Sequence, residues 1–277
     1  MSLANVAAMA AAAENLVLIG DQMQLEQPVQ GTHPGESGLS VLEYYLDGHA
    51  TVPTTLGLFL AETRRLHPEI CRFVSDLVYD GRLQAIAGNE NRRIVLSKSG
   101  NLITTAAGIV FSPLEHDGNT QASAEEVDRV LAITKEIVGQ PKVGADGKPD
   151  GKITLNDVLF VAPYNMQVRR LREALPVGAR VGSVDKFQGQ EAEVVIVSMC
   201  SSFGEYGSRG IEFILDRNRM NVALSRARTL AIVVGDPRIA TTPAYSIDTM
   251  RRINLYCRLI RKHGAQRSLK ESTALGN

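Results

Sequence analysis

Residues 182–198 read GSVDKFQGQEAEVVIVS. The second half, Ala192–Ser198, is mostly apolar on both alternating faces, which is typical of a strand covered by helices on each side. The first half gathers a hydroxyl, a carboxylate, an ammonium group, an aromatic ring and two glycines. Gly189 permits a tight turn that other residues resist. Packing explains such a density of short polar side chains poorly, so this stretch predicts a functional loop between two buried strands.

Short apolar runs alternate with helical patterns along the rest of the chain, which predicts an α/β architecture. Runs that are apolar on both faces favour a mainly parallel sheet with helices on both faces. Ser123 and Glu126 form an S-x-x-E capping box that opens a helix. The predicted strands are Leu16–Ile19, Leu56–Leu60, Gly108–Phe111, Val158–Ala162, Arg180–Val184, Glu193–Met199 and Leu230–Val234. The predicted helices are Leu3–Ala12, Pro68–Val78, Ser123–Val138, Met166–Leu175, Asp216–Arg226 and Ile247–Lys262.

The loop residues of Asp47–Pro53 separate two strand patterns, so we place a domain boundary near residue 50. Residues 1–50 supply one helix, one strand and a Gly/Pro-rich loop, Pro28–Gly38, which is too little to fold alone. We interpret them as the remnant of a preceding domain. Residues 51–277 then form a second domain.

The composition is that of a globular protein, with 44% apolar and 22% charged residues among 277. No apolar run is long enough to span a membrane. The three cysteines are far apart, which suggests a reducing compartment, and we expect a cytoplasmic location. The formal net charge is zero, but Pro163–Gln188 and Asp248–Lys270 are basic and Leu114–Asp157 is acidic. Basic patches of this kind either hold phosphates or are solvated helix faces.

Two polar segments follow or precede predicted elements in the first third of the chain. LVLIGDQMQLEQP (Leu16–Pro28) is an apolar strand ending in Gly-Asp, where a loop can present amides to a phosphate. AETRRLHPEI (Ala61–Ile70) places two arginines just before a helix that begins with Pro68. Arginine offers a planar fork of donors for a phosphate. The plainer alternatives are an ordinary strand and loop, and a surface pair of arginines.

Two further segments carry polar groups in the second half of the chain. In VAPYNMQ (Val161–Gln167) a strand ends beside donors that can hold a sugar-phosphate backbone, and Tyr164 can stack on a base. NRMNVALSRAR (Asn218–Arg228) has one buried helical face, with Arg219 and Arg226 on its flank. An arginine on such a rigid helix can stabilise charge on a transferring phosphoryl group. The alternatives are a satisfied loop and a basic helix end beside the helix dipole.

DGKPDGKITLND (Asp146–Asp157) partly fits a calcium-binding loop, with acids at positions 1 and 5 and glycine at 6. However, Lys148 stands at position 3 and Asp157 at position 12, and a strand is predicted to follow. No Cys/His cluster has metal-ligand spacing either. We therefore expect a surface loop here and no metal site in the chain.

Taken in order, these segments resemble motifs of superfamily 1 helicases, in the branch that includes the nonsense-mediated-decay RNA helicase and the Okazaki-fragment nuclease-helicase. GDQMQLEQP is similar to motif III (GDxxQLxP) and TRRLHPEI to motif IV (YRMHPEI). VAPYNMQ is similar to the short motif that follows. SVDKFQGQE is similar to motif V (TVDxFQGxE) and NVALSRAR to motif VI (NVALTRAR). The resemblance covers nearly the whole chain.

The resemblance implies a RecA-like P-loop NTPase fold, with ATP and Mg²⁺ between two RecA-like domains and a nucleic-acid strand across them. Residues 1–50 would end the first domain, and residues 51–277 would be the second. By position, Gln24, Arg65 and Arg226 would contact the γ-phosphate. Gly20, Asp21, Gly189, Gln190 and Glu191 would line the nucleotide cleft, with Glu191 accepting hydrogen bonds from the ribose. Pro163, Tyr164, Asn165 and Ser183 would follow the backbone of DNA or RNA, single-stranded in either case.

The sequence departs from the family pattern at a few positions. Arg64 stands where the family usually has tyrosine, and Ser183 and Ser225 replace threonine but keep the hydroxyl. GxxxxGK[ST] and an Asp-Glu box for magnesium are absent from the sequence. We therefore expect a fragment that hydrolyses ATP only together with an N-terminal RecA-like domain. The alternative is a non-catalytic module, derived from a helicase, that binds nucleic acid or a protein.

Overall fold

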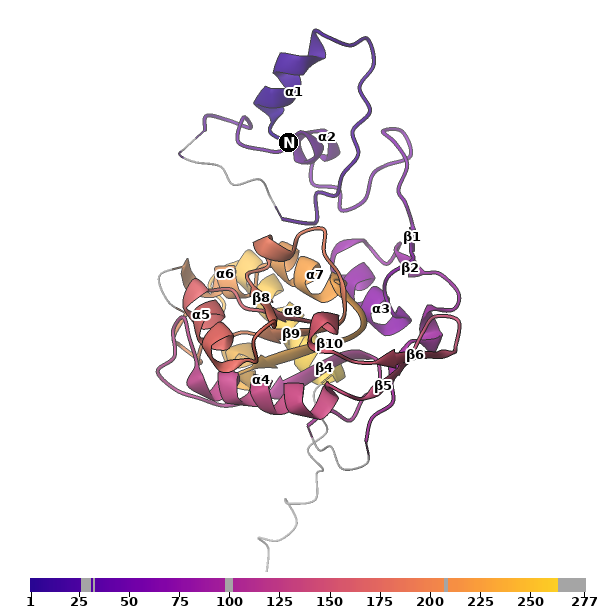
Figure 1. Cartoon of the computed structure of the whole chain (residues 1–277). Helices are drawn as coiled ribbons and strands as arrows, with labels where there is room; N and C mark the ends of the chain where they lie inside the picture. Colours follow the sequence, from indigo (N-terminus) through magenta and orange to yellow (C-terminus); the bar gives the residue numbers. More distant parts are fainter. Residues whose placement is uncertain (26–30, 32, 98–101, 207–208, 264–277) are drawn as a thin grey trace, which may run out of the picture.

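The computed structural model describes residues 1–25, 31, 33–97, 102–206 and 209–263. Its centre is a five-stranded sheet in the order β4-β10-β9-β7-β8, in which every neighbouring pair is parallel (Figure 1). The α/β class and the mainly parallel sheet are thus confirmed. The strands are β4 (Gly108–Pro113), β7 (Val158–Val161), β8 (Arg180–Gly182), β9 (Ala192–Ser198) and β10 (Ala227–Gly235).

The strands are apolar on both faces because each face is covered by helices. In β10, Leu230 and Ile232 pack into one hydrophobic core, and Ala231 and Val233 pack into the other. The first core is closed by α4 and α5, the second by α3, α7 and α8 (Figure 1). These helices are α3 (Pro68–Val78), α4 (Ala124–Ile137), α5 (Asn165–Ala174), α7 (Arg217–Ser225) and α8 (Ile247–His263), each within a few residues of its prediction.

Helix starts follow the capping residues in the sequence. Asp216 accepts a hydrogen bond from Arg219 N at 2.8 Å and so begins α7. Ser123 Oγ accepts from Glu126 N at 3.1 Å and begins α4. The predicted capping box is only half formed, because the Ser123 N–H donates to Gln167 Oε1 (2.9 Å) rather than to the Glu126 carboxylate. Glu126 turns inward instead.

Glu126 is the centre of a buried polar network at the carboxyl edge of the sheet. Its Oε1 lies 3.0 Å from His116 Nε2, and its Oε2 accepts from Ser198 Oγ (2.5 Å) and Cys200 N (3.0 Å). His116 Nδ1 lies 2.7 Å from Ser202 Oγ. The network joins the start of α4 to the segment that follows β9, and so fixes the loops at this edge.

The shifted pKa of His116 reflects this environment. Burial lowers the pKa of the imidazole, but the hydrogen bond and negative charge of Glu126 outweigh burial and raise it above the ordinary value of 6.5. The pair therefore stabilises the fold fully below that ordinary value. Its contribution is lost as the pH rises through the higher pKa of the folded state.

Two predicted strands do not form. Leu16–Ile19 and Leu56–Leu60 are irregular, and Val17 is 82% and Leu58 91% exposed. A buried strand needs a neighbouring strand and covered faces, and within the described residues neither segment has a strand partner. The prediction was wrong because an apolar pattern indicates only that a segment can be buried. It does not indicate whether a neighbouring strand is present to pair with it.

The N-terminal part contains α1 (Leu3–Ala10) and α2 (Val41–Leu46), which stand apart from the sheet (Figure 1). The Asp146–Asp157 segment contains one strand of a hairpin, and Lys142 pairs with Asp150 (3.2 Å) and Asp157 (3.5 Å). β7 follows this segment, as predicted. The remaining elements are β1 (Glu62–Thr63), β2 (Gln84–Ala85), β3 (Arg93–Ile94), β5 (Pro141–Val143), β6 (Pro149–Lys152), α6 (Gly210–Ile214) and short 3₁₀ turns at Asn89–Asn91, Leu155–Asp157, Asp185–Phe187 and Pro237–Thr241. Among the described helices, none is long and apolar enough to cross a membrane.

Candidate functional site

Arg226 lies between α7 and β10, at the amino edge of the sheet, and is only 3% exposed. It donates from Nε to Val222 O (3.2 Å), from Nη1 to Gln190 O (3.3 Å) and from Nη2 to Gln24 Oε1 (3.3 Å). All three acceptors are neutral. Burial lowers the pKa of Arg226, and the charge of Arg65 lowers it further. A guanidinium group remains protonated even so, and the negative charges of Asp21 and Glu191 act on it in the opposite direction.

Arg65 occupies the loop between β1 and α3. Its Nε donates to Glu191 Oε2 at 2.6 Å, and its Nη1 donates to Ser225 O at 3.3 Å. Ser225 is the neighbour of Arg226, so guanidinium groups from two distant segments come close together. Like charges at short range repel, and the repulsion is larger where water is excluded. An anion placed between these two groups would relieve it.

Two carboxylates, Glu191 and Glu193, pair with further arginines at this edge of the sheet. Glu191 Oε1 lies 3.9 Å from Arg228 Nη1, and Glu193 Oε1 lies 3.3 Å from the same nitrogen. Arg92 Nη1 is 3.7 Å from Glu193 Oε1. With Arg65, this is a row in which carboxylates alternate with guanidinium groups. The row holds Glu191 between Arg65 and Arg228, beside Arg226.

Gln24 and Asp21 belong to the N-terminal part, yet they contact Arg226 and Tyr79 directly. Gln24 Nε2 donates to Asp21 Oδ2 at 2.9 Å, which turns the Gln24 carbonyl oxygen toward Arg226. Asp21 Oδ2 also accepts from Tyr79 Oη at 2.6 Å. Predicted site residues from four separated segments, represented by Gln24, Arg65, Glu191 and Arg226, therefore meet in one place.

The glycines and Gln190 have more limited roles. Gly189 has a φ of +80°, which confirms the tight turn predicted from the sequence. Gln190 meets Arg226 through its backbone carbonyl, while its side chain is held by Arg180 at 2.9 Å. Gly20 precedes Asp21, and a Cβ at Gly20 would lie 2.7 Å from Leu42 Cδ1. Pro28, at the end of the motif III segment, lies outside the described residues.

The residues predicted to follow nucleic acid lie at the opposite, carboxyl edge of the sheet. Pro163 and Asn165 follow β7, and Ser183 follows β8. Tyr164 is 6% exposed, donates to Tyr206 O at 3.0 Å and packs 5.2 Å from the Phe213 ring centroid. The interpretation that Tyr164 stacks on a base does not agree with this packing, because neither ring face is open. Asn165 is exposed and Ser183 is partly exposed.

The segment from Ser183 to Glu191 connects the two edges. It leaves the carboxyl end of β8, forms one 3₁₀ turn at Asp185–Phe187 and enters β9 at the amino edge. Val184 and Phe187 pack into the core on the α3 and α7 face. One short segment of chain thus carries a predicted nucleic-acid contact at one end and Glu191 at the other.

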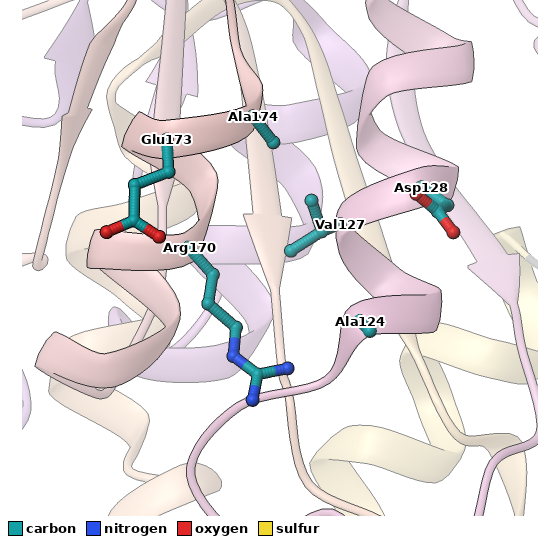
Figure 2. Close-up of a pocket in the computed structure, with 6 residues that line it drawn as sticks. All are labelled: Ala124, Val127, Asp128, Arg170, Glu173 and Ala174. Atoms are coloured by element: carbon teal, nitrogen blue, oxygen red, sulfur yellow. The ribbon is translucent and has the colours of Figure 1, made fainter.

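A shallow hollow between α4 and α5 lies elsewhere on the surface and contains none of the predicted site residues. Figure 2 shows Arg170 of α5 extending toward the start of α4 across it, while Glu173 points away. We do not assign it a role, because its lining is mostly open helix surface.

A family model described as an AAA domain matches residues 40–238. The chain belongs to the superfamily 1 helicases. It is 28% identical over 232 residues to the DNA polymerase alpha-associated DNA helicase A of Schizosaccharomyces pombe, covering 80% of this chain and 33% of that protein. It is 29% identical over 234 residues to the regulator of nonsense transcripts 1 homolog of Drosophila melanogaster, covering 82% of this chain and 19% of that protein.

This helicase chain also matches the DNA-binding protein SMUBP-2 of Rattus norvegicus, with 28% identity over 254 residues, 84% of this chain and 23% of that protein. The chain therefore spans roughly a fifth to a third of the length of these relatives. A solved structure of arterivirus nonstructural protein 10 (helicase) with DNA has 13% identity and a TM-score of 0.28, over 64% of this chain and 25% of that one. The residue roles below rest on the geometry of this chain.

Sequence reasoning missed several residues of this candidate site. Arg92, Glu193 and Tyr79 belong to no motif that was singled out, and Asn221 lies within NVALSRAR without having been assigned a role. Glu193 had a detectable signal, because a carboxylate inside an apolar strand must find partners when it is buried. Tyr79 follows a helix end and has no such signal.

Proposed function

We propose that this chain is the C-terminal part of an ATP-dependent nucleic-acid helicase or translocase, in which Arg65 and Arg226 contact the γ-phosphate of ATP. The observation that carries the proposal is the environment of the buried Arg226. Its hydrogen-bond acceptors, which include Gln24, are all neutral, and the charged Arg65 lies nearby. A buried cation without a carboxylate partner is costly, and a phosphate oxygen would satisfy it. The residues therefore fit the terminal phosphate of a nucleoside triphosphate.

ATP with Mg²⁺ supplies the driving free energy through hydrolysis of the terminal phosphoryl group. The P-loop and the magnesium-binding carboxylates belong, in this proposal, to an N-terminal RecA-like domain. What this chain contributes is positive charge, fixed in place by Val222 O, Gln190 O and Ser225 O. Groups held in position before the reaction stabilise developing charge without reorganising.

Glu191 changes partners in this mechanism. In the structure its carboxylate is held by Arg65 at 2.6 Å. When Arg65 turns to a phosphate, the carboxylate is released and can accept hydrogen bonds from ribose hydroxyls. A shift of Glu191 on nucleotide binding would then displace the start of β9 and the segment that leads back to Ser183.

The nucleic-acid contacts are proposed for the carboxyl edge of the sheet. Pro163, Asn165 and Ser183 are at least partly exposed there and can contact a sugar-phosphate backbone. The relatives' names include both a DNA helicase and a regulator of nonsense transcripts. The proposal therefore covers DNA or RNA and rests on backbone contacts, which do not distinguish base sequence.

Replacing Arg65 tests the proposal with an adjacent control. In the full-length protein we expect Arg65→Ala to lower the rate of ATP hydrolysis stimulated by nucleic acid on the order of 10², the cost of losing one stabilising donor. Arg64 is exposed and precedes Arg65 directly. Arg64→Ala should leave the rate unchanged. Equal rates for the two variants would argue for the non-catalytic binding module instead.

A further inference from the structure

Tyr79 connects the N-terminal part to the second domain through its hydroxyl. It is the residue that ends α3, and it is buried, with 8% of its surface exposed. Its Oη donates to Asp21 Oδ2 at 2.6 Å and accepts from Asn221 Nδ2 at 3.1 Å. Burial raises the pKa of Tyr79, and the Asp21 charge raises it further, so the hydroxyl keeps the proton that it donates.

Asn221 makes a second contact with the same loop. It is fully buried on α7, and its Nδ2 donates to Met23 O at 2.7 Å. A backbone carbonyl can only accept, so this bond fixes the orientation of the Asn221 amide. Within the described residues, Asn221 Oδ1 has no hydrogen-bond partner. Buried acceptors are rarely left unpaired.

Asp21 passes these contacts on to Gln24. Its Oδ1 accepts from Met23 N at 2.9 Å, and its Oδ2 accepts from Gln24 Nε2 at 2.9 Å. Because the amide nitrogen of Gln24 is held by Asp21, its oxygen faces Arg226 Nη2 at 3.3 Å. An unbroken series of hydrogen bonds therefore runs from Asn221 and Tyr79 to the guanidinium group of Arg226.

We propose that Tyr79 and Asn221 are positioning residues that hold the loop Asp21–Gln24 against α3 and α7, so that the Gln24 carbonyl oxygen orients the guanidinium group of Arg226 toward the phosphate. The inference rests on the proposed function and extends it to residues that touch no nucleotide. α7 carries both Asn221 and Val222, whose carbonyl holds Arg226, so one helix fixes both sides of the Gln24–Arg226 contact.

The substitution Tyr79→Phe tests the hydroxyl alone, because the ring keeps its packing against Phe59 and the α3 core. In the full-length protein we expect kcat for ATP to fall about tenfold, the scale of one hydrogen bond to a charged group. KM for ATP should stay within about twofold, since the alignment matters most for the transition state. In a Gln24→Ala background, Tyr79→Phe should have no further effect.

Tyr256→Phe is the matched control. Tyr256 is also buried, and its hydroxyl donates to Asp236 O at 3.0 Å, away from the loop. This variant should keep the wild-type kcat even where it lowers the melting temperature. A normal kcat in Tyr79→Phe, or losses that simply add in the Gln24→Ala background, would overturn the positioning role.

Hydrogen exchange in the 277-residue chain gives a readout that needs no hydrolysis. Tyr79→Phe should speed amide exchange at Met23 and Gln24 about tenfold, whereas Tyr256→Phe should not. Unchanged exchange in Tyr79→Phe overturns the inference. A normal kcat in Tyr79→Phe beside a slow Arg226→Ala variant removes only this inference, but normal turnover in Arg226→Ala removes the proposed function as well.

Discussion

Replacing Arg226 with alanine is expected to lower the rate of ATP hydrolysis by the proposed helicase by a factor on the order of 10³, the scale of an arginine finger. The structure gives the reason. Arg226 is held by Val222 O and Gln190 O, so its remaining nitrogen is aimed at one place, where Gln24 now lies. The rate should be measured at saturating nucleic acid and ATP.

Binding of nucleic acid by the Arg226→Ala variant should change little, because Arg226 lies at the amino edge of the sheet while Asn165 and Ser183 lie at the carboxyl edge. Arg226→Lys should recover only part of the rate, since an ammonium group cannot reproduce the planar fork. Arg93→Ala, at an exposed arginine of β3, is the control for loss of charge. A wild-type rate in Arg226→Ala would contradict the assigned role.

The second large effect concerns stability. Glu126→Gln is expected to lower the free energy of unfolding by about 3 kcal/mol, because it removes one partner of a buried ion pair. Glu126 accepts from Ser198 and Cys200 as well as facing His116, and an amide nitrogen cannot accept any of these bonds. Denaturant unfolding followed by circular dichroism would measure the loss.

The loss should depend on pH in a definite direction. The pKa of His116 is raised in the folded state, so the stabilising charge is fully present below about 6.5 and disappears as the pH rises through the folded pKa. Glu126→Gln should therefore cost more at pH 5.5 than at pH 8.5. Glu125→Gln, at the exposed neighbour in the same helical turn, should cost less than about 0.5 kcal/mol. Equal losses of unfolding free energy in both variants would contradict a stabilising role for the buried network around Glu126.

The sheet could be predicted from the sequence because its strands are apolar on both faces, a pattern that is typical of strands between two helical layers. The same rule failed at Leu16–Ile19. The apolar pattern is present there, but within the described residues no strand pairs with this segment. Helix starts were predictable from local hydrogen bonds, as at Ser123. The destination of the Glu126 side chain was not, since its partners come from residues far along the chain.

The candidate site also contains residues that could be predicted from the sequence and residues that could not. The positions of Arg65, Arg226 and Glu191 were anticipated through the resemblance of their motifs, and the structure brings them together. Composition and spacing alone favoured an ordinary surface role for Arg65 and Arg226, and a functional loop only for the segment that contains Glu191. The packing of the Tyr164 ring against Phe213 could not be foreseen, because the sequence does not say which side of a loop meets the core.

The connection from Ser183 to Glu191 limits how this domain can move. Most crossovers between parallel strands contain a full helix, which can shift as a unit and absorb displacement. Here the return from the carboxyl end of β8 to the start of β9 uses only a single 3₁₀ turn, anchored by the buried Phe187. A displacement of Glu191 must therefore either pull on Ser183 or be taken up by rotation at Gly189, whose φ of +80° most other residues avoid. The two edges of the sheet are thus linked by a short segment in which Gly189 is one point of backbone rotation.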